Sequence, residues 1–431
     1  MSLQLIIGGS GSGKSYRIYQ NIIRESMENP DRNYLVLVPE QFTMQTQKDL
    51  VRLHPNHGIL NIDVLSFQRL AYHVFDEVGG GHRKVLEDTG KNLVLRRLAQ
   101  LNKDKMKVLG SKLERMGYIS EMKSVLSELA QYNVDGTLLD KAAELVADNR
   151  LLQDKLHDIG LLQEEFRKYR EGAYITSEEI LEELCRVAER SEKIKDTVIA
   201  LDGFTGFTPI QYLLLDRLLK CAKKVMVTVT LDSEEYPFTS VREEELFALS
   251  KNTIWELRHI AAENGIEEEE PILLSGENPR FGQNEELVFL EKHLLRYDNA
   301  SYTEDPKNIR LYRWADPEQE VIGTAREILR LIREGGYRYR DIAVVTGDMG
   351  SYCNYVQRHF DDCGIPCFID YKRDILANPF VEFLRAVFQM MEENFSYDSV
   401  FRYLKSGLTG ISTDVVDRMD NYCVAMGLRG Y

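Results

Sequence analysis

The feature that most constrains the fold lies near the N-terminus, in the segment LIIGGSGSGKS. Leu5, Ile6 and Ile7 form an apolar run suited to a buried parallel strand, and residues 8–15 then follow the pattern G-x-x-x-x-G-K-S. Glycines here let successive backbone N–H groups turn toward a bound anion, and a following helix adds its positive end. The segment therefore predicts a strand, a phosphate-binding loop and a helix, in that order.

Each position of this pattern has an expected role in binding a nucleoside triphosphate such as ATP. We expect Lys14 to reach the β- and γ-phosphates and Ser15 to ligate Mg²⁺. The predicted nucleotide-binding residues are Gly8, Gly9, Ser10, Gly11, Ser12, Gly13, Lys14 and Ser15. The alternative is a glycine- and serine-rich turn without a ligand, but the complete pattern between a strand and a helix favours the nucleotide site.

Apolar segments separated by helical patterns predict an α/β fold with a parallel, RecA-like sheet. The expected strands are LQLIIG, NYLVLVP and NIDVLSF before residue 75, and DTVIALDGF and KKVMVTVTLD after residue 195. Residues 83–190 contain apolar residues at helical spacing and no convincing strand, so we expect a helical insertion. The first RecA-like domain is then residues 1–82 and 191–300, with the acidic run Glu267–Glu270 as a solvated loop.

The remainder of the chain predicts a second α/β unit. A polar, turn-rich linker precedes it, followed by the expected strands IRLYRWA and DIAVVTG, with a helix between them that Asp316 and Pro317 begin. Residues 308–395 are therefore expected to be the start of a second RecA-like domain. Residues 396–431 are expected to be the truncated start of a further helical subdomain.

Composition places the chain among globular, cytoplasmic proteins without membrane contact. It is 43% hydrophobic and 29% charged, and no apolar run approaches the roughly 20 residues that span a bilayer. The formal net charge of −15 argues against a protein coated in nucleic acid, but it leaves room for a basic groove. The six cysteines are scattered, and we expect the one close pair, Cys363 and Cys367, to be buried free thiols.

A second half of the nucleotide site is expected at the end of another strand. Phosphate-loop enzymes hold Mg²⁺ with a carboxylate there, usually beside an acid that polarises the attacking water. Asp202 ends the segment TVIALD and is the expected Mg²⁺ ligand, although an aspartate after a strand is often only a turn residue. The next residue, Gly203, has no side chain, so the water-activating acid is missing from its usual place.

The order of these motifs resembles superfamily 1 helicases of the UvrD type and, more closely, the N-terminal part of the AddB (RexB) family, subunits of bacterial AddAB helicase-nucleases. The resemblance extends over the whole chain, and the segments VPEQFT and DGFTGFTPIQ make it specific. Three departures stand out. The sequence Asp202-Gly203-Phe204-Thr205 replaces Asp-Glu-Phe-Gln, LDSEEYP replaces a glutamine-containing sensor, and MGSYCNY stands where an arginine facing the γ-phosphate is usual.

The resemblance implies a helicase-like region that binds ATP with Mg²⁺ and scans single-stranded DNA for the recombination hotspot Chi, in double-strand break repair and homologous recombination. It implies a heterodimer with an AddA-type motor subunit, acting on single- and double-stranded DNA. An iron-sulfur cluster and nuclease domain are expected only beyond residue 431, so this chain should lack nuclease activity and efficient ATPase activity. The alternative is an independent P-loop enzyme, a small-molecule kinase or GTPase, but no Asn-Lys-x-Asp guanine-reading motif is present.

Residues that follow two predicted strands suit a single strand of DNA, because open α/β sheets bind ligands at the carboxyl ends of their strands. Aromatic rings offer stacking faces, arginine can meet phosphate or guanine, and glutamine and threonine can hydrogen-bond bases. By resemblance the same positions coincide with DNA-contacting loops, and the expected DNA-binding residues are Gln41, Thr43, Phe67, Arg69, Tyr72 and Phe207. The alternative is that Phe67 and Tyr72 are core residues at helical spacing.

Overall fold

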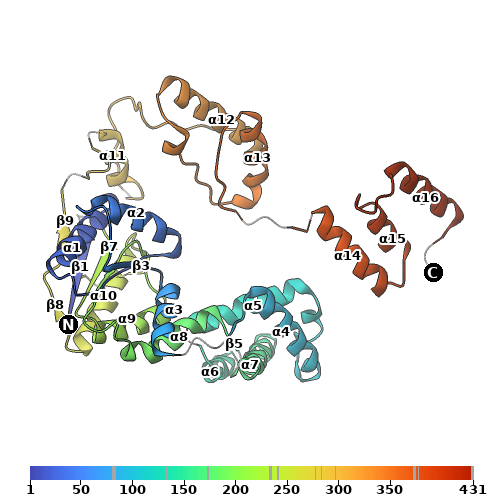
Figure 1. The fold of residues 1–431 in the computed structure, drawn as a ribbon, viewed down its shortest axis with the longest axis horizontal. Coiled ribbons are helices and arrows are strands. Elements are labelled where there is room, and N and C mark those ends of the chain that lie inside the picture. The colour runs from blue at the N-terminus through green and yellow to red at the C-terminus, as the bar shows by residue number, and fades with distance from the viewer. Residues whose placement is uncertain are drawn as a thin grey trace. The chain divides into compact units, whose positions relative to one another are not determined.

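A computed structural model describes most of the chain as two compact units, Met1–Ile309 and Arg310–Tyr431. The described residues are 1–79, 84–132, 134–146, 148–171, 174–232, 235–239, 242–276, 278–282, 284–296, 298–371, 375–376 and 378–428. Figure 1 traces the helices and strands of both units. Each unit is described by itself below.

A parallel sheet forms the centre of the first unit, in the order β3-β2-β6-β7-β1-β8, with β9 also paired to β1. The strands are β1 (Ser2–Gly8), β2 (Tyr34–Leu37), β3 (Ile62–Leu65), β6 (Val198–Leu201), β7 (Lys224–Thr230), β8 (Glu267–Glu268) and β9 (Ile272–Leu274). All five strands predicted for this unit are confirmed. Because their described pairings are parallel, their carboxyl ends share one edge of the sheet.

Part of the acidic run is built into this sheet, so the expectation of a loop is wrong for residues 267–268, whereas their exposure to solvent is as expected. Its first two residues form β8 and pair with the start of β1. Glu269 then accepts hydrogen bonds from Ser2 Oγ at 2.6 Å and from Lys224 Nζ at 2.7 Å. The charge of Lys224 and the backbone of β1 supply partners that the run alone does not reveal.

Helices cover both faces of the sheet, and an apolar core lies on each side. The helices are α1 (Lys14–Glu28), α2 (Thr43–Leu53), α3 (Phe67–Val78), α8 (Ser177–Val187), α9 (Pro209–Cys221), α10 (Ala248–Glu263) and the peripheral α11 (Glu285–His293). Alternate residues of β1 enter opposite cores: Leu5 and Ile7 pack with α3, α8, α9 and α10, whereas Ile6 packs with α1 and α2. The central strands are therefore buried on both faces of the sheet.

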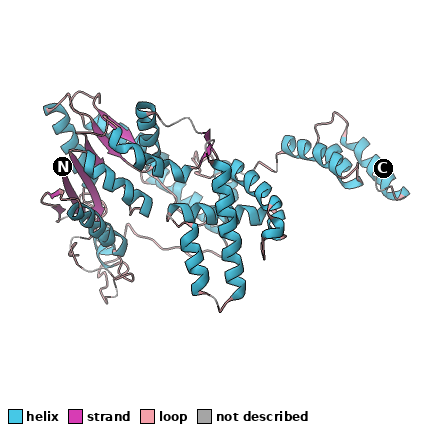
Figure 2. Cartoon of the chain, turned by 90° about the horizontal axis from the view of Figure 1, so that it is seen from below, coloured by secondary structure: helices cyan, strands magenta, loops and turns pink. Residues whose placement is uncertain are grey.

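The insertion has a helical core of its own, as expected, but with two differences. Its helices are α4 (Asp88–Leu101), α5 (Met116–Gln131), α6 (Gly136–Leu145) and α7 (Arg150–Arg170). A short parallel pair, β4 (Lys84–Val85) and β5 (Tyr174–Ile175), was not predicted. The last helix of the predicted insertion, α8, packs in the sheet's core against α3 and α9. Figure 2 shows the strands gathered in the main sheet, apart from the β4-β5 pair.

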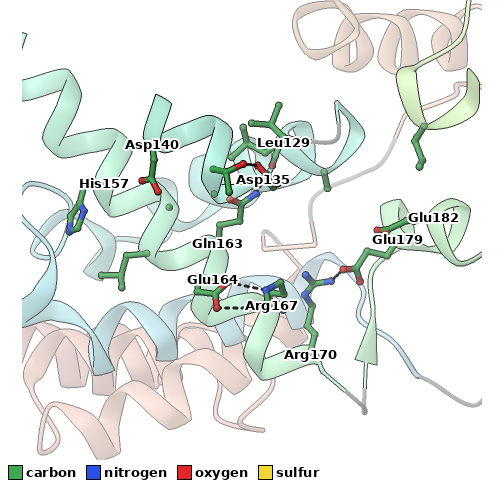
Figure 3. Close-up of a pocket in the computed structure, with 17 residues that line it drawn as sticks. Leu129, Asp135, Asp140, His157, Gln163, Glu164, Arg167, Arg170, Glu179 and Glu182 are labelled. Carbon is green, nitrogen blue, oxygen red and sulfur yellow. Dashed lines mark hydrogen bonds and ion pairs between the residues drawn. The ribbon is translucent and has the colours of Figure 1, made fainter. Parts of the chain in front are cut away.

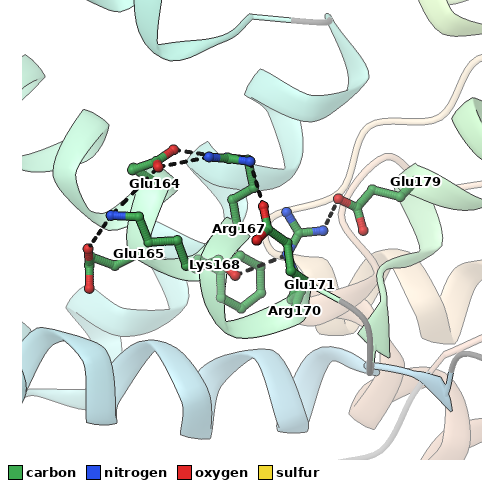
Figure 4. Close-up of polar contacts among 8 residues, drawn as sticks. Glu164, Glu165, Arg167, Lys168, Arg170, Glu171 and Glu179 are labelled. Atoms are coloured by element: carbon green, nitrogen blue, oxygen red, sulfur yellow. Dashed lines mark hydrogen bonds and ion pairs between the residues drawn. The ribbon is translucent and has the colours of Figure 1, made fainter.

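A cavity of about 640 Å³ lies where α5, α6 and α7 face α8 and α9 (Figure 3). Both arginines that line it form ion pairs with nearby glutamates. Arg167 donates to Glu164 Oε1 at 2.8 Å and to Glu171 Oε1 at 2.6 Å, and Arg170 pairs with Glu179 (Figure 4). The pair between Arg170 and Glu179 joins the end of α7 to α8, so it fastens the insertion to the sheet domain.

The second unit consists of helices in the residues described. They are α12 (Pro317–Glu334), α13 (Met349–Asp362), α14 (Pro379–Glu392), α15 (Tyr397–Leu404) and α16 (Thr413–Met426). The predicted start of α12 is confirmed, because Asp316 Oδ1 accepts a hydrogen bond from Gln319 N at 2.8 Å and Pro317 is the first residue. None of the described helices in either unit is long and apolar enough to cross a bilayer.

The two strands predicted in this unit are not formed in the described residues. The segments IRLYRWA and DIAVVTG contain no paired strand, and Leu311 and Val345 are 99% and 92% exposed. A parallel strand requires a neighbour that accepts and donates backbone hydrogen bonds, and neither segment has one here. The prediction of a second RecA-like domain therefore lacks its sheet in this structure.

The same absence of a covering sheet affects the close cysteine pair. Both thiols are free, but Cys363 and Cys367 are exposed, so the expectation of burial is wrong. The segment that follows α13 lies at the surface, where Phe368 is 90% exposed.

Candidate nucleotide and nucleic-acid site

The loop between β1 and α1 adopts a conformation that depends on its glycines. Gly11 and Gly13 have φ angles of +86° and +94°, in the region that favours glycine. Gly8 is required for a different reason, because a Cβ there would lie 2.5 Å from Ser12 Oγ and 3.0 Å from Leu274 Cβ. The backbone can therefore turn sharply at the end of a buried strand while remaining close to its neighbours.

No side chain caps the backbone N–H groups at the start of α1. Gly13 is the N-cap and supplies no side-chain cap, and the first turn contains no acidic residue. The Ser12 hydroxyl is buried and has no hydrogen-bond partner within the described residues. Lys14 Nζ donates to the carbonyl oxygens of Gly8 at 2.9 Å and Gly9 at 2.8 Å. A bound anion would satisfy the first-turn N–H groups and attract Lys14 away from its own loop.

A second cationic side chain reaches this loop from residues 278–280, which sequence analysis missed. Asn278 Nδ2 donates to Ser10 O at 2.6 Å, and a Cβ on Gly11 would lie 2.8 Å from Arg280 Cβ. Arg280 lines a cavity of about 280 Å³ together with Lys14. Burial lowers the pKa of Lys14, the charge of Asp202 opposes this, and the charge of Arg280 lowers it further. Two cations beside one cavity favour an anionic ligand.

Asp202 lies at the end of β6 and lines the same cavity as Lys14 and Ser15. It is 5% exposed and accepts hydrogen bonds of 2.7 Å from Thr228 Oγ1 and from Tyr19 Oη. Each carboxylate oxygen retains a free lone pair, so a metal ion can still be held. No group of three or more His, Cys, Asp or Glu within the described residues could bind a metal ion without further ligands. The donor set therefore fits Mg²⁺ only together with a phosphate.

The residue after Asp202 shows why an acid is absent. Gly203 has a φ of +78°, and a Cβ there would lie 3.6 Å from Phe42 Cδ2 and 3.6 Å from Pro39 Cδ. A glutamate would be strained by this backbone conformation, while its Cβ would be in ordinary contact with Phe42. The backbone conformation of this turn therefore favours glycine, and Phe42 lies beside it at ordinary contact distance.

A row of aromatic rings fills the space behind this turn. The ring of Phe67 lies 5.1 Å from that of Phe204, Phe204 lies 5.2 Å from Phe207, and Phe207 lies 5.6 Å from Tyr212. Phe67 is 6% exposed, so its ring offers no face to a base in this structure, and the core alternative describes it. Phe204 and Phe207 are half-buried and line a second cavity, of about 200 Å³, beside the first.

The loops predicted to contact DNA are neighbours in space. Leu37 at the end of β2 pairs with Leu65 of β3 and Leu201 of β6, so the three following loops emerge side by side. Arg69 Nε donates to Glu40 Oε1 at 2.9 Å, which joins the first two loops.

The six predicted DNA-binding residues differ in accessibility. Gln41, Arg69 and Tyr72 are exposed, and Tyr72 is 39% accessible. Thr43 is 8% exposed and donates to Glu40 O at 3.0 Å, so its hydroxyl serves the turn before α2. The structure thus brings these residues to one sheet edge but buries Phe67 and Thr43.

Three residues of this region were missed from the sequence. Phe42 was overlooked because it stands between the selected Gln41 and Thr43, and only its contact with Gly203 reveals its position. Asn278 and Arg280 occur in a polar turn without helical or strand periodicity. A signal was available in the pattern Asn-Pro-Arg before a helix, but no local rule connects it to a loop some 270 residues earlier.

Comparisons with known proteins show the family to which the chain belongs. A family model described as "ADDB, N-terminal" matches residues 5–291. A protein from Lachnoclostridium phytofermentans, named as the B subunit of an ATP-dependent helicase/deoxyribonuclease, is 45% identical over the whole chain, which covers 38% of that relative. Proteins of the same name from Desulforudis audaxviator and Clostridium novyi are 38% and 34% identical over the whole chain, which covers 37% and 38% of them. The chain thus spans little more than a third of these relatives' length.

Proposed function

We propose a function from the premise that this chain belongs to the AddB N-terminal family. It acts as the helicase-like part of a helicase-nuclease subunit, in double-strand break repair and homologous recombination. It binds ATP with Mg²⁺, holds single-stranded DNA and scans it for Chi. Its own ATP hydrolysis is weak or absent.

The observation that carries the proposal is the cavity shared by Lys14, Ser15, Asp202 and Arg280. The open start of α1 offers N–H groups to the phosphates, and the two cationic side chains add charge. Ser15 and Asp202 would hold Mg²⁺, which neutralises phosphate charge when bound. The arginine that usually faces the γ-phosphate is absent after DIAVVTGD. Arg280, which belongs to the first unit, would lie beside the phosphates instead.

Weak hydrolysis follows from the other end of this cavity. Gly203 carries no carboxylate, and its positive φ disfavours a residue that has one. Loss of a water-activating group typically lowers a rate by about 10²- to 10⁴-fold. The nucleotide is therefore a structural or regulatory ligand, and turnover is supplied by a motor subunit.

Single-stranded DNA is proposed to lie on the edge formed by the loops after β2, β3 and β6. Gln41, Arg69 and Tyr72 are accessible there, and Phe207 borders the adjoining cavity. Phe67 and Thr43 support this surface from below instead of contacting bases. The relatives are named as one subunit of an enzyme, which implies a partner, and we propose that the partner is an AddA-type motor. An independent small-molecule kinase or GTPase is not favoured, because the relatives that align with the whole chain are named as helicase/deoxyribonuclease subunits.

The proposal is tested by measuring two ligands on the same preparation. A fluorescent ATP analogue with Mg²⁺ should bind, while phosphate release remains slow with or without a single-stranded oligonucleotide. The oligonucleotide itself should bind and should be weakened by Arg69→Ala. Robust DNA-stimulated hydrolysis by the chain alone, abolished by Lys14→Ala, would contradict weak turnover, and failure to bind any oligonucleotide would contradict the DNA function.

A further inference from the structure

The helical insertion carries a basic segment in an acidic chain. Residues 96–115 contain seven Lys or Arg and two acidic residues, a formal charge of +5, whereas the whole chain carries −15. The seven are Arg96, Arg97, Lys103, Lys105, Lys107, Lys112 and Arg115, and all are exposed. We name residues 96–115 the basic segment. Such a local reversal of charge is the pattern of a surface that meets a polyanion.

Much of this charge is not used within the chain. Arg96, Arg97, Lys112 and Arg115 have no ion-pair partner within the described residues. Lys107 pairs with Asp154 at 3.2 Å, at the border of the segment. The unpaired side chains remain available to an external anion without first breaking an internal contact.

A buried carboxylate holds the middle of the segment in place. Asp158 of α7 is 0% exposed, and it accepts hydrogen bonds of 2.8 Å from the backbone N–H groups of Lys107, Val108 and Leu109. A buried charge is stable only with such partners. The loop is therefore fixed to the insertion's core, and its lysine side chains start from an ordered backbone.

Further contacts keep the segment compact. A Cβ on Gly110 would lie 2.9 Å from Lys103 O, so the loop closes on itself at this glycine. The turn that begins at Lys112 packs against α4, which carries Arg96 and Arg97. Because the backbone is already ordered, binding would cost less conformational entropy than it would for a flexible basic tail.

We propose that the basic segment is a second nucleic-acid contact, which binds the phosphodiester backbone of DNA without reading its sequence. This inference rests on the proposed DNA function and deepens it, because it assigns DNA backbone binding to the insertion, apart from the sheet edge. Lysines and arginines contribute charge to any sequence, and the segment has only two acidic residues to repel phosphate. An acidic face of a partner protein is the competing occupant, and the test separates the two.

The test uses a triple variant, Arg97→Gln with Lys112→Gln and Arg115→Gln, in the whole 431-residue chain. The matched control is Arg24→Gln with Arg190→Gln and Arg326→Gln, which removes three exposed positive charges that have no ion-pair partner in the described part of the chain. Binding of a random-sequence oligonucleotide, single-stranded in one arm and duplex in the other, is measured over a salt series. For the triple variant we expect binding to be about tenfold weaker. The slope of log K against log salt concentration should be smaller in magnitude by about 2 to 3, because up to three phosphate contacts are lost.

Each outcome decides the inference. Weaker binding with a shallower salt slope in the triple variant, and near-parental binding in the control, supports it, and the arm that responds identifies the form of DNA. Parental binding by the triple variant, while Arg69→Ala still weakens binding, overturns the inference and leaves the proposed function intact. If the parent binds neither oligonucleotide, both fail. Loss of binding to a purified motor subunit with unchanged DNA binding makes the segment a protein interface and overturns the inference.

Discussion

The two ends of the nucleotide cavity are built in opposite ways. At the phosphate loop, the start of α1 is uncapped and Ser12 Oγ has no partner among the described residues. At the turn after β6, Phe42 lies beside the exposed Gly203, and aromatic rings pack behind the turn. The phosphate-loop end therefore has polar groups without partners among the described residues, and we call it the open end. The end at the turn after β6 has apolar rings that pack on one another, and we call it the packed end. The contrast indicates that binding and hydrolysis are separable here.

The largest expected effect tests the packed end. Phe67→Ala should lower the free energy of unfolding by about 3 to 5 kcal/mol, because it removes a buried ring from the core. Denaturant unfolding followed by circular dichroism measures this. The control is Tyr72→Ala on the same helix, which should cost less, because its ring is 39% exposed and packs only its edge against Phe75. An unchanged unfolding midpoint for Phe67→Ala, with oligonucleotide binding lost, would show that the ring faces DNA and would break the comparison.

The next effect tests the open end. Lys14→Ala should weaken binding of ATP by about 100-fold, because charged hydrogen bonds to phosphate are worth about 1.5 to 3 kcal/mol each. Isothermal titration with a non-hydrolysable analogue and Mg²⁺ measures the affinity. Lys48→Ala, an exposed lysine of α2, is the control and should bind as the parent does. Equal affinities for Lys14→Ala and the parent would remove the phosphate-loop assignment.

A smaller effect on nucleotide affinity is expected at Arg280, which lines the same cavity as Lys14. Arg280→Ala should weaken the same analogue by about tenfold, since Arg280 is exposed and its contact with phosphate is screened more than that of Lys14. AMP should distinguish the two roles, because the loss should be much smaller without β- and γ-phosphates. Arg24→Ala provides the control. If the affinity falls equally for AMP and the triphosphate, Arg280 orders the loop without contacting the phosphates.

The smallest effect is expected on ATP turnover, when an acid is placed after Asp202. Gly203→Glu should raise ATP turnover by less than about threefold, because the positive φ strains a glutamate at this position. It should also cost about 1 kcal/mol of stability, shared by Gly203→Ala, which has the same strain without the acid. Phosphate release and thermal unfolding measure the two effects. A hundredfold gain in turnover by Gly203→Glu alone would mean that only the missing acid separates this turn from an active one.

Sequence patterns were sufficient where local chemistry decides the outcome. Apolar runs predicted the five main strands of the first unit, and Asp316 with Pro317 predicted the start of α12. Patterns failed where a distant partner decides. The first two residues of the acidic run form β8 because they pair with the start of β1. The predicted strands near Leu311 and Val345 do not form, because no neighbouring strand is present in the described residues.

The sequence by itself determined the phosphate-loop pattern, the missing acid after Asp202 and the family resemblance, because these depend on residue type and order along the chain. Only the tertiary structure decided that Phe67 is buried, that Phe42 lies beside Gly203, and that Arg280 lines the same cavity as Lys14. Helical spacing leaves the choice between core and surface open for an aromatic residue, since both occur on amphipathic helices. Contact across some 270 residues depends on how strands are ordered in the sheet, which short-range periodicity does not encode.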